Sequence, residues 1–142
     1  MALVLQPHHS ILLYRSSFLA IPPVLYCYYR GHYTLVFAPV TIFLTSVNYW
    51  RHPTNSWRRL IDVMCSLILC VYQGQLAWTS EYATIYYLLV LSGLSCYPIG
   101  YHYYNKGMQL ESVYLHVLLH VFMCISSLIL YHGEIPAISS RR

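Results

Sequence analysis

The stretch QLESVYLHVLLHVFMCISSLILYH, from Gln109 to His132, decides the fold class of this chain. It carries one charged residue, Glu111, near its start and then an almost unbroken run of apolar side chains. A helix needs about 20 such residues to cross the hydrocarbon layer of a bilayer. The stretch therefore predicts a transmembrane helix, and it places two imidazoles, those of His116 and His120, inside it.

The composition of the whole chain agrees with this prediction. Of its 142 residues, 58% are hydrophobic and 8% are charged, whereas an ordinary soluble domain has about 25% charged residues. The net charge of +4 comes from basic residues at the ends of apolar blocks, not from the basic stripe that binds nucleic acid. We therefore expect residues 1–142 to form a single all-α transmembrane helix bundle with no nucleic-acid partner.

Five apolar segments approach the length of a membrane span. They are Ile11 to Tyr29, Tyr33 to Trp50, Leu60 to Thr79, Tyr82 to Ile99, and Gln109 to His132. Arg15 lies near the start of the first segment, and Pro22-Pro23 interrupts its middle. Four helices with a re-entrant first segment are therefore the alternative.

The distribution of Lys and Arg predicts the orientation of a multi-pass integral membrane protein, because basic loops stay in the cytoplasm. With five spans, one side receives Arg51, Arg58, Arg59 and Lys106, and the other receives Arg30, Arg141 and Arg142. The N-terminus is then expected to be cytoplasmic.

His116 and His120 are the first candidates for chemistry. Residues four apart lie on one face of a helix, so both imidazoles can converge on one cation, with zinc–nitrogen bonds of about 2.0 to 2.1 Å. A catalytic zinc site generally adds a third protein ligand and a water. The alternative is that each imidazole forms a hydrogen bond with a neighbouring helix.

Ser46, His52 and Asp62 fall on the same side of the predicted bundle as the histidine pair. A carboxylate beside a metal site can orient ligands and polarise a bound water, which is the functional interpretation of Asp62. The alternative for both residues is a purely structural role. Asp62 would favour the N-terminus of its helix and pair with Arg58-Arg59, and Ser46 would bond to backbone.

The order of these residues resembles a known superfamily. Ser46, Asp62 sixteen residues later and His116-x-x-x-His120 are similar to the pattern of alkaline ceramidases, progestin and adiponectin receptors and related membrane hydrolases. Members of that superfamily have seven spans, bind zinc through histidines on the second and last helices, and are proposed to hydrolyse lipid amides or esters with zinc-bound water. The resemblance implies zinc as cofactor, membrane lipids as substrates, and catalytic roles for Ser46 and Asp62.

This chain departs from the superfamily pattern at one metal ligand. The pattern is Ser-x-x-x-His, and here Trp50 stands four residues after Ser46, with His52 two residues later as the candidate third ligand. Two spans are also missing. The sequence therefore favours a minimal or degenerate zinc-dependent lipid hydrolase, and its competitor is a non-catalytic protein that contacts other membrane subunits.

Overall fold

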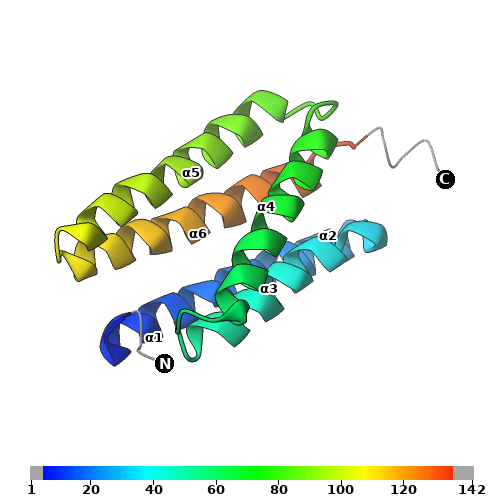
Figure 1. The fold of residues 1–142 in the computed structure, drawn as a ribbon. Helices are drawn as coiled ribbons and strands as arrows, with labels where there is room; N and C mark the ends of the chain where they lie inside the picture. The colour runs from blue at the N-terminus through cyan, green and yellow to red at the C-terminus, as the bar shows by residue number, and fades with distance from the viewer. Residues whose placement is uncertain (1–4, 136–142) are drawn as a thin grey trace.

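The computed structural model describes residues 5–135, and every α-helix or 3₁₀ helix within them belongs to one helical bundle (Figure 1). The elements are α1 (Pro7–Ser16), η1 (Ser17–Ala20), α2 (Ile21–Tyr29), η2 (Tyr33–Leu35), α3 (Phe37–Trp50), α4 (Trp57–Ala77), α5 (Ala83–Asn105) and α6 (Gln109–His132). The all-α fold class predicted from the sequence is confirmed. The last predicted segment, Gln109 to His132, coincides with α6.

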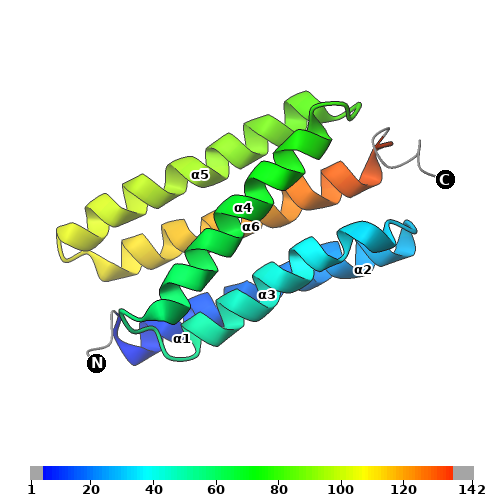
Figure 2. The same cartoon turned by 45° about the vertical axis from the view of Figure 1, so that its right-hand side comes forward.

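The helices run back and forth between the two ends of the bundle (Figures 1 and 2). The α1–η1–α2 run goes one way, and α3, α4, α5 and α6 then alternate in direction. One end holds the start of α1 and the α3–α4 and α5–α6 connections. Gly107, in the α5–α6 connection, has a φ of +79°, a left-handed conformation that glycine adopts without steric cost.

Four helical segments within residues 5–135 are long and apolar enough to cross a membrane: Pro7–Tyr29, Trp57–Ala77, Ala83–Asn105 and Gln109–His132. Only 22% to 28% of each apolar window is buried inside the protein. Most of these apolar side chains therefore face outward, which suits contact with lipid and not with water. By length and composition, the chain has the helices of a multi-pass membrane protein.

The first predicted segment agrees with expectation, since Pro7–Tyr29 is long and apolar enough to span a membrane, whereas the second is not among the four helices of that kind within residues 5–135. Pro22 and Pro23 do not turn the chain back on itself. They lie in the first turn of α2, where backbone N–H groups have no partner within the helix, so proline is tolerated there. The second segment is the shorter one. Its α-helix, α3, has 14 residues and spans about 21 Å at about 1.5 Å per residue.

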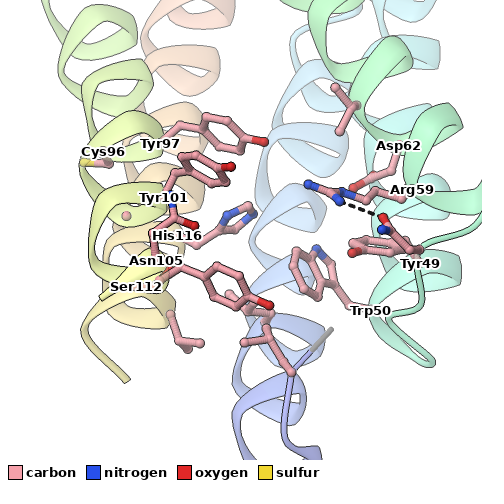
Figure 3. A pocket seen from close by; sticks show the side chains of 17 residues that line it. Tyr49, Trp50, Arg59, Asp62, Cys96, Tyr97, Tyr101, Asn105, Ser112 and His116 are labelled. Atoms are coloured by element: carbon pink, nitrogen blue, oxygen red, sulfur yellow. Dashed lines mark hydrogen bonds between the residues drawn. The ribbon is translucent and has the colours of Figure 1, made fainter. Parts of the chain in front are cut away.

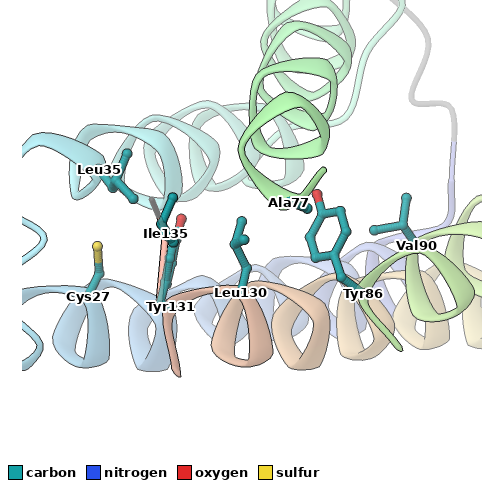
Figure 4. Packing of buried hydrophobic residues seen from close by; sticks show 8 residues of the cluster. All are labelled: Cys27, Leu35, Ala77, Tyr86, Val90, Leu130, Tyr131 and Ile135. Carbon is teal, nitrogen blue, oxygen red and sulfur yellow. The ribbon is translucent and has the colours of Figure 1, made fainter. Parts of the chain in front are cut away.

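Two kinds of contact hold the bundle together at the end opposite the α5–α6 connection. Figure 4 shows the apolar cluster there, formed by Cys27, Leu35, Ala77, Tyr86, Val90, Leu130, Tyr131 and Ile135. Beside it, the buried amide of Gln73 donates to the Tyr131 hydroxyl at 2.6 Å and accepts from Ser127 at 3.3 Å. These bonds join α4 to α6 inside the bundle.

Helices α5 and α6 form the most extensive helix pair of the bundle. A Cβ added at Gly93 would lie 3.1 Å from the Phe122 Cβ, and one added at Gly100 would lie 3.4 Å from the Ser112 carbonyl oxygen. Small residues of this kind let helix backbones approach closely in membranes. A methyl group at Gly74, by contrast, would meet only the Tyr87 ring, at 3.9 Å.

We predict that Gly93→Ala destabilises the protein while Gly74→Ala does not. Alanine is favoured over glycine in a helix by about 1 kcal/mol, so the two variants start from the same gain. At Gly93 the clash with Phe122 should reverse it, lowering the unfolding temperature of the detergent-solubilised protein. Equal unfolding temperatures for the two variants would contradict the close packing of α5 on α6.

Candidate functional site

Asp62 and Ser46 form the first polar pair of the site. The Ser46 hydroxyl on α3 donates to Oδ1 of Asp62 on α4 at 2.7 Å, and the two side chains are 5% and 8% exposed. The expected pairing of Asp62 with Arg58-Arg59 is not seen: Arg59 donates to the Asn55 side chain at 2.8 Å, and Arg58 lies over the Trp57 ring, 5.9 Å from its centroid. The carboxyl group thus joins α4 to α3 through a hydroxyl and not through an ion pair.

His116 and His120 form the second polar pair, on α6. Their ring centroids are 5.0 Å apart and their planes are close to perpendicular, at 80°. Nδ1 of His120 shares a hydrogen bond of 2.7 Å with Ser16 Oγ on α1. Ser16 Oγ also lies 3.0 Å from the Leu13 carbonyl oxygen. A hydroxyl has only one proton to donate. When Ser16 donates it to the Leu13 carbonyl oxygen, His120 Nδ1 must be the donor to Ser16 Oγ.

A cleft of about 550 Å³ lies between the two pairs of helices α3–α4 and α5–α6. Figure 3 shows its walls: Tyr97, Tyr101 and His116 come from α5 and α6, and Tyr49, Trp50, Arg59 and Asp62 come from α3 and α4. It is lined by aromatic rings with a few converging polar groups, as ligand sites of about 300 to 1,000 Å³ commonly are. One catalytic candidate, Asp62, and one metal candidate, His116, therefore line the same cleft.

Ser46 and His120 line a second, smaller cavity of about 60 Å³. Ser16, Gln73 and Ser127 contribute further polar groups to it. Its volume is enough for a water molecule or two and far too small for a lipid. The members of each pair therefore face different cavities, and only Asp62 and His116 can meet a ligand of any size.

His52 lies apart from the other candidates. It is exposed in the turn after α3 and is not part of the lining of the cleft. Among residues 5–135, no group of three or more His, Cys, Asp or Glu is placed to hold a metal ion. The donors that come together are two imidazoles, one of them bonded to Ser16. This set does not fit a catalytic zinc site, which generally uses three protein ligands.

Several lining residues were not predicted from the sequence. Trp50 stands where the superfamily has a histidine, and its ring centroid lies 5.1 Å from that of His116, edge to face. Tyr97 and Tyr101 are four residues apart on α5, a spacing that places them on one helix face. That spacing could have identified the two tyrosines as neighbours on one face of α5. The approach of Arg59 and Asn55 to this face depends on how the helices pack, which no local pattern reveals.

We predict that protein purified without chelator carries well below one zinc per chain. The physical reason is that two imidazoles without a third protein ligand hold zinc weakly. His52→Ala should leave the zinc content unchanged, because His52 and the pair do not form a three-residue group that could hold a metal among residues 5–135. Elemental analysis of both proteins checks this, and one zinc per chain that disappears in His52→Ala would show that His52 does complete the site.

We also predict that Ser46→Ala lowers the free energy of unfolding by about 1 to 3 kcal/mol, the usual cost of leaving a buried acceptor without its donor. The control is Ser95→Ala, since Ser95 is exposed and bonds only its own helix, to the Ser92 carbonyl oxygen. Denaturation in detergent measures both variants. If the two lose equal stability, the Ser46–Asp62 bond does not help hold α3 to α4.

Neither a protein-family model nor a curated protein nor a solved structure matches this chain. The geometry of the cleft and of the two polar pairs is accordingly the basis for assigning a function.

Proposed function

We propose that this chain is a multi-pass membrane protein that binds one membrane lipid, with the polar head in the cleft and an acyl chain in an adjoining groove. The observation that carries the proposal is the continuity of two cavities. The groove, of about 580 Å³, is lined by Asn55, Ser56, Trp57, Arg59, Leu60, Val63 and Tyr97. Asn55, Arg59, Val63 and Tyr97 also line the cleft, so a single ligand can occupy both.

The two cavities differ in character as the two parts of a lipid do. Groove residues Trp57 and Leu60 are 64% and 63% exposed, on the outer face of a helix long and apolar enough to span a membrane. Arg59 lines both cavities, and the cleft adds the carboxyl group of Asp62. The acyl chain of a bound lipid would lie along the groove, in contact with side chains that otherwise face bulk lipid. Its head would reach Arg59 and Asp62 in the cleft.

The depth of the site also suits a lipid head. Arg59 and Asp62 lie in the first two turns of α4, and Tyr104 and Asn105 lie at the end of α5. The cleft therefore belongs to one end of the bundle, where tyrosine and arginine side chains favour the headgroup region of a bilayer. The basic residues Arg51, Arg58 and Lys106 are found at the same end, and the sequence predicts this side to be cytoplasmic.

Lipid hydrolysis is the second candidate function, and the observation in its favour is that Asp62 and His116 line one cleft. The resemblance to ceramidase-like hydrolases points to the same class of ligand. The zinc that such chemistry uses lacks its third ligand among the described residues. Lipid binding without turnover does not need that ligand, and the described residues therefore support it better than hydrolysis.

We predict that protein purified in a mild detergent retains at least one lipid per chain and that Val63→Trp loses it. Val63 lines both the cleft and the groove, so an indole there fills the passage between them. Val71→Trp is the matched control, on the exposed face of the same helix and outside both cavities. Mass spectrometry of extracted lipid measures retention. Equal lipid in Val63→Trp and Val71→Trp would rule out this site.

A further inference from the structure

The two charges of the cleft are not paired with each other. Arg59 donates to Asn55 at 2.8 Å, and Asp62 accepts from Ser46 at 2.7 Å, so each has a neutral partner. A guanidinium has five N–H donors and a carboxylate about four acceptor sites. Both groups therefore keep capacity for an outside partner, and a ligand that forms an ion pair with each of them carries a negative and a positive charge.

The anionic part of such a ligand would find two kinds of donor. Arg59 is the first, since its planar fork suits phosphate oxygens. The second is Nε1 of Trp50, which is buried and has no hydrogen-bond partner among the described residues. Figure 3 shows the nitrogen side of this indole turned toward Arg59 and Asp62. A buried donor left unpaired lowers stability, and an oxygen of the ligand would remove that cost.

The cationic part would meet one carboxylate and several aromatic rings. Asp62 is 8% exposed, and a charged side chain is almost never that buried without a partner. Tyr49, Tyr97 and Tyr101 line the cleft with it. Aromatic faces attract quaternary ammonium groups, which have no N–H to donate. A primary ammonium would bond hydroxyl or amide oxygens instead, whereas the rings of these three tyrosines offer a quaternary group apolar contact as well.

We propose that the head bound in the cleft is phosphocholine, with its phosphate on Arg59 and Trp50 and its trimethylammonium group on Asp62 and the tyrosine rings. This inference rests on the proposed lipid-binding function. A purely anionic head would leave Asp62 facing negative charge. A neutral head would leave both charges of the cleft without an ionic partner.

The test is a titration of the detergent-solubilised protein with dihexanoyl phospholipids below their critical micelle concentrations, followed by calorimetry. The choline lipid should bind at least tenfold more tightly than the glycerol or ethanolamine lipid. Asp62→Asn keeps an oxygen for Ser46 and should abolish the preference for choline over glycerol. Arg59→Gln should weaken choline-lipid binding about tenfold. Arg58→Gln, which changes the neighbouring arginine outside both cavities, should not.

Each outcome bears on one proposal or both. Three results would overturn the phosphocholine assignment and leave lipid binding in place. The choline lipid could bind no more tightly than the glycerol lipid, or no more tightly than the ethanolamine lipid. Alternatively, Arg59→Gln could behave like Arg58→Gln. If short-chain lipids do not bind but a lipid is retained on purification, the head of that lipid decides. A choline head supports the assignment and any other head refutes it. Loss of both titration signal and retained lipid refutes both proposals.

Discussion

The close approach of α5 and α6 at Gly93 and Gly100 forms the most extensive helix pair of the bundle. In lipid there is little hydrophobic drive between helices, so association depends on packing and on interhelical hydrogen bonds. The α5–α6 pair has the tightest packing, and α1 and α2 lie against α6 on its other side. Helix α4 packs mainly on α3 and makes few contacts with α5. The cleft is the space that this division leaves between the two helix pairs.

The polar side chains inside the bundle fall into two groups that serve different ends. One group is satisfied within the chain, such as Ser46 with Asp62, Ser16 with His120, and Gln73 with Tyr131. Each of these bonds joins two different helices, and in a medium without water each is costly to break. The other group keeps unused hydrogen-bonding or ionic capacity and gathers at the cleft. Asp62 belongs to both groups, which links the stability of the α3–α4 pair to the ligand site.

Much of the fold could be predicted from the sequence because apolar run length has a direct physical meaning in a bilayer. Gln109–His132 is the plainest case, and the meeting of Ser46 with Asp62 follows from two consecutive helices that turn back on each other. The shortness of α3 could not be predicted, because Tyr33–Leu35 is as apolar as a helix start and yet forms a separate 3₁₀ turn. Whether Pro22-Pro23 would turn the chain back could not be predicted either, because the effect of proline depends on its position within a helix.

The candidate site was predictable only in its local parts. The spacing of His116 and His120 fixes their shared helix face, and the structure keeps them adjacent. The place of His52 depends on the turn after α3, and the partners of His116 depend on the register of α5 against α6. Trp50 illustrates the limit. Its identity marks a missing metal ligand, whereas the burial of its unpaired nitrogen is evident only in the folded protein.

The length of α3 has a consequence for the surrounding bilayer. Its 14 residues reach about 21 Å, against about 30 Å of hydrocarbon in a typical membrane. A helix shorter than the layer around it is accommodated when the bilayer thins beside it, at a cost that grows with the difference in thickness. Headgroups would then sink toward the protein beside α3.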